Sequence, residues 1–277
     1  MKKLRSLSSG LNLVALATLG SLSQTAMAQL GPGGSAAKGD ESTFTLGAGL
    51  GVGPRFMGSK ENQVGPILLA DYQHHSGFFA STMRGLGWGS DIGNFKYSLA
   101  LHARGDRDEK DGKSGIGGNK GSKELRGMGK IKSSAVGLLN VGYQVHDRVG
   151  LSATLELPLT NRDNGRALHL GSSIKLFETD KDSFSLDASA SYGDTKYLRT
   201  YFGVTAAQSA ASGYKLYAPK SGFYQADVSL AWHRQIDKRW GIIGSIGATH
   251  LLGDAGKSPL ALRKTAPQAG VIVTYNY

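Results

Sequence analysis

The apolar residues of this chain recur with a period of two through most of its length, and no other feature restricts its fold as strongly. In residues 95–104 the odd positions carry Phe, Tyr, Leu, Leu and Ala, whereas the even positions carry Lys, Ser, Ala, His and Arg. Residues 184–192, 224–233 and 271–277 alternate in the same way, and weaker alternation occurs at 43–52, 64–73, 78–87, 132–145, 148–158, 166–177 and 239–251. Because successive side chains of a strand point to opposite faces, each segment predicts a β-strand with one apolar and one polar face.

The alternation alone also fits a soluble β-sandwich, but three details favour a transmembrane barrel. The segments are about 10 residues long, which suits a tilted membrane strand and exceeds the length of about 5–6 residues typical of soluble strands. Many positions on the apolar faces are Ala or Gly, which give a thin core for a sandwich but suffice against lipid. Aromatic residues lie near the segment ends, as interfacial girdles do: Phe95, Tyr192, Tyr224, Trp232, Trp240, Tyr275 and Tyr277.

The polar faces carry charges deep within the predicted strands. These charges are expected to face a polar lumen: Lys96, Arg104, Glu156, Lys175, Asp187 and Asp227. The mature chain has no stretch of 18 consecutive apolar residues, so no transmembrane helix is predicted. A closed barrel pairs its backbone donors and acceptors without water, which an open sheet within lipid cannot do.

Short polar connections alternate with long ones, as the periplasmic turns and external loops of outer-membrane barrels do. The short ones lie at 74–77, 146–148, 179–182 and 236–239, and the long ones at 53–63, 105–131, 194–221 and 253–267. The pattern shows 11 clear strands, whereas a barrel with both termini on one side needs an even number. The alternation fails before residue 95, so one strand is missed or merged there. We therefore expect about 12 antiparallel strands, within a range of roughly 10–14.

The first 28 residues show the order of features found in a secretory signal peptide. A basic start and an apolar stretch precede an A-x-A motif, which predicts cleavage between Ala28 and Gln29. Residues 29–42 are expected to form a flexible mature N-terminus, and residues 43–277 the barrel.

The mature chain is basic and contains no cysteine. The predicted signal segment holds three basic residues and no acidic ones, so the mature net charge is +11 − 3 = +8. For an exported chain, anionic glycans, lipopolysaccharide or an acidic protein suit this charge better than nucleic acid does. The absence of cysteine excludes disulfides and cysteine nucleophiles, and the spacing of the seven histidines predicts no metal site and no cofactor.

Three features admit a chemical interpretation, but each has a simpler alternative. The stretch 104–132 is rich in Lys, Arg and Gly and is expected to be a mobile loop, either solvated or docking an anionic partner. Its end at 125–129 is less polar, which favours folding back onto the barrel. The glycine-rich runs at 47–53 and 115–118 lack a following Gly-Lys-Ser/Thr motif and helix, so they predict strand packing or loop flexibility rather than phosphate binding. Polar-face histidines, aspartates and serines permit a Ser-His-acid site, but no nucleophile elbow is present, and we predict no enzymatic activity.

The segment 197–217 is the most unusual part of the chain, because aromatic residues flank a short polar stretch. Residues 205–212 contain helix-forming Ala and Gln, with Thr205 placed to cap the helix and Gly213 placed to end it. The flanking aromatic residues predict a short helix or loop near 205–213 that plugs the barrel mouth or forms a recognition surface. The candidate plug or binding residues are Tyr197, Tyr201, Phe202, Gly203, Gln208, Tyr217 and Asp254.

The same segment resembles the MltA-interacting protein (MipA)/OmpV family of outer-membrane proteins. The resemblance rests on a Tyr-Phe-Gly-Val run at 201–204, on Gln208, Ser212-Gly213 and Tyr217, and on a Leu-Leu-Gly-Asp-Ala run at 251–255 followed by Ser258-Pro259. Weaker similarities at Pro54, 58–59, 78–79 and 125–129 extend it over nearly all of the mature chain. The chain departs from the family pattern at Phe56-Met57, at Lys257 and at the final Tyr277.

The resemblance implies an outer-membrane barrel. In the best-known branch of the family it implies a scaffold that joins a lytic transglycosylase to a bifunctional penicillin-binding protein in murein synthesis. Other members are similar to osmotic or adhesion-related surface proteins, and because the family has no established enzymatic activity, no catalytic residue carries over. We expect a scaffold in peptidoglycan assembly, with a narrow pore or an osmotic or adhesion-related surface protein as the alternative. About 8–12 strands leave a lumen filled by side chains, whereas about 16 leave a channel.

Overall fold

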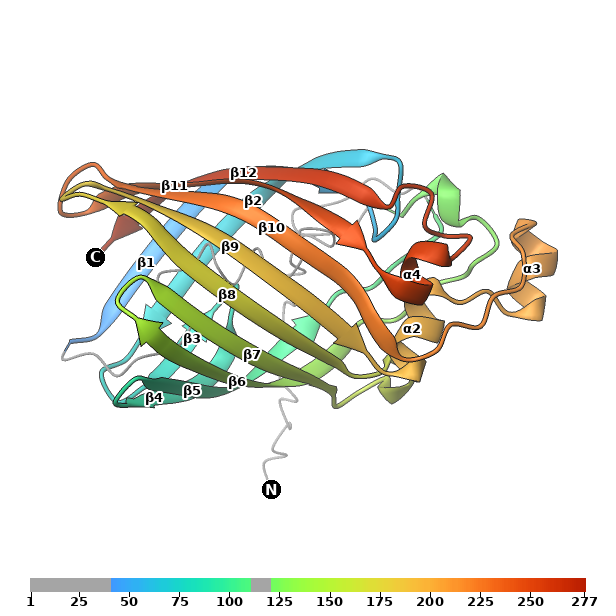
Figure 1. The fold of residues 1–277 in the computed structure, drawn as a ribbon, viewed down its shortest axis with the longest axis horizontal. Helices are drawn as coiled ribbons and strands as arrows, with labels where there is room; N and C mark the ends of the chain where they lie inside the picture. Colours follow the sequence, from blue (N-terminus) through green and yellow to red (C-terminus); the bar gives the residue numbers. More distant parts are fainter. Residues whose placement is uncertain (1–40, 111–120) are drawn as a thin grey trace, which may run out of the picture.

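The computed structural model describes residues 41–110 and 121–277, which form one closed antiparallel β-barrel (Figure 1). Within these residues, twelve strands follow one another around the barrel in chain order, and the first pairs with the last. The predicted fold class is thereby confirmed. The predicted signal peptide, its cleavage between Ala28 and Gln29 and most of the predicted flexible N-terminus lie outside the described residues.

The strands are long and the helices are short. The strands are β1 (Thr43–Pro54), β2 (Asn62–Gln73), β3 (Phe78–Ser81), β4 (Gly85–Ile92), β5 (Phe95–Arg104), β6 (Ser134–His146), β7 (Val149–Pro158), β8 (Ala167–Glu178), β9 (Asp182–Gly193), β10 (Gly222–Gln235), β11 (Trp240–Leu251) and β12 (Thr265–Asn276). The helices are η1 (Lys123–Leu125), η2 (Arg162–Asn164), α2 (Thr195–Phe202), α3 (Ala206–Ser212) and α4 (Gly253–Lys257). Among the described residues, no helix has the length and apolarity needed to cross a membrane.

The sequence pattern merged two strands into one, and these strands lie before residue 95, where the alternation of short and long connections failed. The segment 78–87 is β3, a three-residue turn and the start of β4. The turn is Thr82-Met83-Arg84, which contains none of the residues that usually mark a turn, and only Gly85 after it has a positive φ, of 81°. The predicted count of about 12 is therefore right, and the missing strand came from a turn without a turn signal.

Alternate side chains of the strands point outward or into the lumen, and the outward row is apolar. Its most exposed members include Leu50, Val64, Leu99, Leu101 and Ile246, each between 57% and 65% exposed. An apolar surface of this extent is unfavourable against water and favourable against lipid, so this band is the membrane-facing wall.

Strand β10 contains a β-bulge that changes the predicted side of one aromatic residue. The register with β9 shifts between Phe223 and Gln225, so Phe223 takes the outward position and is 47% exposed. Tyr224, expected on the outer face, is instead 2% exposed and lies inside the barrel. A bulge inserts one unpaired residue and reverses the alternation before it, which a period of two cannot reveal.

The two ends of the barrel have connections of different length, as predicted. Turns of a few residues join the strands at the end where β1 and β12 carry the chain termini of the barrel, at the left of Figure 1. At the opposite end the connections are longer, except for the three-residue turn between β3 and β4, and they carry α2, α3 and α4. We call these the short-turn end and the long-loop end.

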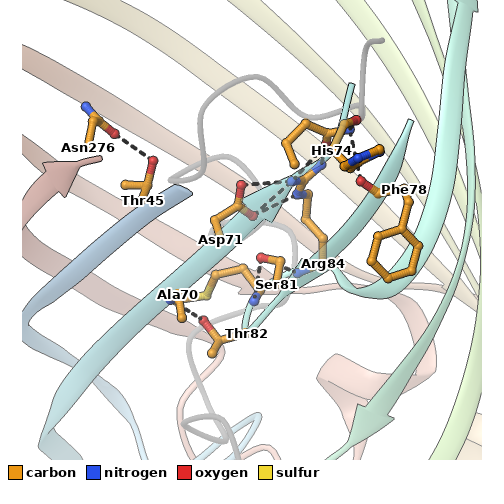
Figure 2. A network of polar contacts seen from close by, with 11 residues as sticks. Thr45, Ala70, Asp71, His74, Phe78, Ser81, Thr82, Arg84 and Asn276 are labelled. Atoms are coloured by element: carbon orange, nitrogen blue, oxygen red, sulfur yellow. Dashed lines mark hydrogen bonds and ion pairs between the residues drawn. The ribbon is translucent and has the colours of Figure 1, made fainter. Parts of the chain in front are cut away.

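The tip of the β3–β4 hairpin folds toward the lumen (Figure 2). Arg84 Nη2 lies 2.8 Å from Asp71 Oδ2, and the Asp71 side chain is buried on β2. Thr82 Oγ1 donates to the Leu68 carbonyl and accepts from the Ala70 N–H, so one hydroxyl replaces strand pairing where β3 ends. Beside this tip, Met83 packs on a small apolar patch of the lumen formed by Ile67, Ile243 and Ile272.

Candidate functional site

A buried helix covers the lumen at the long-loop end. Asp194 caps the N-terminus of helix α2, and its carboxylate accepts a hydrogen bond of 2.7 Å from the Tyr197 N–H. Four of its eight residues are buried: Tyr197, Leu198, Tyr201 and Phe202. They pack on Ala167 of β8, Tyr224 of β10, Leu251 of β11 and Ala255 of α4. The helix is thus fixed to the barrel wall by its apolar face.

Below α2 a chain of polar contacts extends from β5 across β6 to β7, β8 and β9, with side chains from four of these five strands. Arg104 Nε on β5 donates to Glu156 Oε1 on β7 at 2.6 Å. Glu156 Oε2 lies 3.3 Å from His169 Nε2 on β8, and His169 Nδ1 lies 2.9 Å from Ser191 Oγ on β9. Arg104, Glu156 and Ser191 are 6%, 2% and 1% exposed. The chain therefore joins one wall of the barrel through groups that water does not reach.

Arg104 is held from several directions. Its Nη1 donates to the carbonyl oxygens of Asn164 and Gly165, each at 3.0 Å, in the β7–β8 loop. Its guanidinium carbon lies 5.0 Å from the ring centroid of Tyr197, within range of a cation–π contact. The charge of Arg104 thus joins the polar chain in the wall to the aromatic face of α2.

The side chains of Ser191, His169 and Glu156 contact one another in the order found in a catalytic triad. With Nε2 protonated, His169 donates to Glu156 and accepts the Ser191 hydroxyl at Nδ1. Two features favour a structural role: the Ser191 side chain is buried under α2, and Glu156 is already neutralised by Arg104. Absence of enzymatic activity stays a prediction for this chain.

A second layer of packing lies outside α2, where four loops meet. Buried side chains from each loop form it: Phe56, Leu125, Met128, Val204 and Leu260. Leu125 and Met128 belong to the less polar end of the stretch 104–132, and their burial confirms that this end folds back onto the barrel. The described arm at 121–132 is therefore packed rather than mobile. Its apolar residues draw it onto the barrel, while 111–120 lie outside the described residues.

Helix α3 confirms the predicted local signals but is not the plug. Thr205 Oγ1 accepts from the Gln208 N–H, and Gln208 Oε1 accepts from the Thr205 N–H, which is a capping box, and Gly213 ends the helix at a φ of 78°. No residue of α3 is buried, and in Figure 1 it projects beyond the barrel. The plug expected near 205–213 lies at 195–202, because the large apolar side chains belong to α2 and those of α3 are small or polar.

The remaining candidate plug residues fasten the long loops to one another. Gln208 Nε2 donates to the Met128 carbonyl at 2.8 Å, and the Tyr217 hydroxyl donates to the Asp254 carbonyl at 2.8 Å. Gly203 ends α2, where a Cβ would approach the Arg199 carbonyl oxygen to 2.3 Å. Six of the seven candidates therefore take part in the closure as buried or cross-linking groups, and Gly203 permits the chain to leave it.

The six charges predicted to face the lumen do not form one site. Only Arg104 and Glu156 are paired with each other. Asp227 is buried on β10 and accepts from Ser189, Gln225 and Thr249 hydroxyl or amide groups. Asp187 accepts from Ser185 at 3.0 Å, Lys175 pairs with Glu178 near the short-turn end, and Lys96 is half-buried on β5.

Arg107 was not singled out by the sequence, yet it joins the loop layer to α2. Its Nη1 donates to the Tyr201 carbonyl at 2.5 Å, and Arg107 and Ile131 exchange backbone hydrogen bonds. Burial lowers the pKa of the Arg107 guanidinium to about 10, which leaves it charged at neutral pH. Burial also raises the pKa of the Tyr197 and Tyr201 hydroxyls, so both stay neutral.

Comparison with known proteins shows which family this barrel matches. The family model described as MltA-interacting protein MipA matches residues 46–277. No curated protein sequence matches the chain significantly.

Solved structures that align with this chain include an outer-membrane channel from Pseudomonas putida F1, with 10% identity, a TM-score of 0.45, and coverage of 89% of this chain and 99% of that one. The toluene transporter of Ralstonia pickettii shows 10% identity, a TM-score of 0.35, and coverage of 95% and 98%. The outer-membrane protein OmpT of Vibrio cholerae shows 10% identity, a TM-score of 0.33, and coverage of 86% and 97%.

Proposed function

Because this outer-membrane β-barrel belongs to the MltA-interacting protein MipA family, we propose that it is a non-enzymatic scaffold of peptidoglycan assembly. In this proposal its short-turn end faces the periplasm and holds a lytic transglycosylase, which the family description supports, next to a penicillin-binding protein. Short periplasmic turns and long external loops are the usual orientation of such barrels.

The observation that carries the proposal is the closure of the long-loop end by α2. Tyr197, Leu198 and Phe202 are 6%, 0% and 0% exposed, and the loop layer outside them is also buried. A barrel closed in this way serves as a rigid membrane anchor better than as a conduit. Its role then depends on surfaces presented at the opposite end.

The short-turn end presents charged groups suited to a polar protein interface. Three turns each place an aspartate next to a basic residue, at Asp147-Arg148, Asp180-Lys181 and Asp237-Lys238, and these positions are exposed. Polar, exposed contacts are typical of transient interfaces and tune association through charge complementarity.

Binding of the two purified enzymes tests the proposal. The barrel in detergent is titrated with a lytic transglycosylase and with a penicillin-binding protein, and then with both together. Replacing Arg148, Lys181 and Lys238 by Glu should weaken binding about tenfold or more, which corresponds to about 1.4 kcal/mol. The control carries Lys215→Glu and Lys220→Glu, exposed charges at the long-loop end, and should bind as the parent does.

A narrow pore is the second candidate, favoured by the polar lumen below the closed end. Asp187 and Asp227 are buried in that lumen, and Lys96 also faces it. Conductance across planar bilayers distinguishes the two functions. A scaffold should give no steady conductance above the bilayer background. Steady ion conductance together with no enzyme binding would replace the scaffold with the pore.

A further inference from the structure

An open apolar groove crosses the outer face of the barrel wall and has a volume of about 850 Å³. Two rows of outward side chains border it, and each row runs across neighbouring strands in register. One row is Phe184, Trp232, Gly244, Val271 and Leu50. The other is Leu230, Ile246, Ala269, Val52 and Val64.

The groove exists because the two smallest residues of these rows lie on adjacent strands. Gly244 on β11 and Ala269 on β12 have large neighbours in the same rows, such as Trp232 and Ile246. The missing side-chain volume at these two positions leaves a depression between rims of large apolar groups.

The fold does not require glycine at position 244. A Cβ there would lie 3.4 Å from Trp232 Cε3, an ordinary contact, and the backbone does not have a positive φ. At Gly247, three residues along β11, a Cβ would approach the Val228 carbonyl oxygen to 2.4 Å, so glycine is needed there. Since glycine weakens a strand, its use at position 244 needs another reason, and an occupant of the groove supplies one.

At one end of the groove the aromatic side chains are held in place by their own contacts, and polar groups lie next to them. The Trp232 indole N–H donates to Asp182 Oδ1 at 2.9 Å, and the ring stacks on Phe184 with centroids 6.3 Å apart. Arg234, two residues along β10 toward the short-turn end, lies 3.2 Å from Asp182 Oδ2 and is exposed. An apolar channel with a cation at the interfacial end matches an acyl chain attached to a phosphate group.

We propose that this groove binds one phospholipid of the membrane leaflet at the short-turn end. One acyl chain lies over Gly244 and Ala269, and the phosphate lies near Arg234. The groove is continuous with the lipid-facing wall, so hydrocarbon reaches it without any change of fold. The proposal depends only on the membrane location and not on the scaffold role.

Native mass spectrometry of the barrel, purified in mild detergent and offered phosphatidylethanolamine, tests the site. The parent should retain one lipid per barrel. The double variant Gly244→Leu, Ala269→Leu fills the groove and should lose most of that lipid, and Arg234→Ala should retain several-fold less than the parent. Ala153→Leu, a matched outward change on β7 in the opposite wall, should retain lipid as the parent does.

Fluorescence gives a second measurement that does not depend on detergent. In a variant with Trp88→Phe and Trp240→Phe, brominated acyl chains should quench Trp232 at a several-fold lower mole fraction than they do after Gly244→Leu. A heat-modifiability gel confirms that each variant is folded. Equal lipid retention by the filled and parent barrels, no retention by either, or a dimer that disappears when the groove is filled would each overturn the proposal.

Discussion

The two ends of the barrel are stabilised in different ways. At the long-loop end, the Arg104–Glu156 pair is 7% and 3% exposed in its side chains and lies beneath a helix and a layer of packed loops. At the short-turn end, the Lys175–Glu178 pair is 40% and 57% exposed, and the connections are turns of a few residues. One end depends on buried tertiary contacts, and the other depends on strand pairing and an aromatic rim. Perturbations of the same chemical kind should therefore have unequal effects at the two ends.

The largest effect is expected at the seam of the short-turn end. Tyr275 packs edge-on against Trp240 at 4.9 Å, the Tyr277 N–H donates to the Phe44 carbonyl at 2.9 Å, and Thr45 bonds Asn276 (Figure 2). Deleting residues 275–277 removes these contacts and the two β1–β12 pairs at the short-turn end, Thr45–Asn276 and Leu46–Tyr275, so insertion into the outer membrane should fail while export continues.

Cell fractionation with a heat-modifiability gel measures the outcome of this deletion. The truncated chain should accumulate in the periplasm and be degraded, whereas Tyr277→Phe should assemble as the parent does. A truncated protein that still migrates as a folded outer-membrane species would refute the closing role of these residues.

The next largest effect is expected from the buried pair at the long-loop end. Glu156→Ala leaves Arg104 charged, buried and without a counter-ion, which should lower the free energy of unfolding by about 3–5 kcal/mol. Glu178→Ala breaks an exposed pair and should cost less than about 1 kcal/mol. Unfolding titrations in lipid vesicles compare the two. Similar losses would contradict the proposed difference between the ends.

Midway between the ends, the effect of a charged substitution should depend on whether the residue faces the lipid or the lumen. Val228 is 50% exposed on the outer face of β10, whereas Ser229 faces the lumen. Val228→Arg places a charge in hydrocarbon and should destabilise the barrel by about 2–4 kcal/mol, and Ser229→Arg should cost clearly less. The pair Leu186→Arg and Ser185→Arg on β9 repeats the test. Equal losses in the vesicle titrations would defeat the membrane assignment of the outer face.

The architecture of the wall could be predicted because it follows from local alternation. The outward rows, the long and short connections and the α3 caps all depend on residues a few positions apart. The prediction of the strands and their faces failed at two places where no nearby residue type signals the change in structure. The turn at Thr82-Met83-Arg84 lacks the usual turn residues, and the bulge before Gln225 inverts the faces of its neighbours.

The buried site could be predicted only in part because it is assembled from distant segments. The aromatic residues of 197–202 and the charges Arg104 and Glu156 were recognised separately. Their contact depends on the stagger of β5, β7 and β8, which bring positions 52 residues apart to 2.6 Å. No spacing in the sequence indicates that His169 and Ser191 continue the same chain of contacts.

A smaller effect is expected at α3, which projects beyond the packed layer. Thr205→Ala removes the side chain that accepts from the Gln208 N–H, a loss of about 1 kcal/mol for the helix. Because α3 buries no residue, this loss should stay local. Hydrogen exchange should quicken at the amides of 206–212 while the barrel unfolds at its usual temperature. Thr205→Ser should keep the protection, and loss of global stability would show that α3 belongs to the sealed end.

The smallest effect concerns one exposed turn and depends on pH. In the β10–β11 turn, the Asp237 carboxylate accepts from the Arg239 and Trp240 N–H groups, both at 2.8 Å, and these bonds lower its pKa below the usual 3.8. A carboxyl group whose pKa is lowered by folding stabilises the protein above its unfolded pKa. That contribution disappears as the pH falls through the lower, folded value.

Asp237→Asn should therefore be slightly less stable than the parent at neutral pH, and the difference should shrink as the pH falls through the lowered pKa of the Asp237 carboxyl group. Thermal unfolding in vesicles from pH 6 to about pH 2.5 measures the difference between the two proteins, which removes the titration of all other carboxylates. Asp108→Asn is the matched change at the long-loop end, where the Lys110 N–H likewise lowers the pKa of the Asp108 carboxyl group. A parent–variant difference that stays constant over this range would show that the turn is held by hydrogen bonds that do not need the charge.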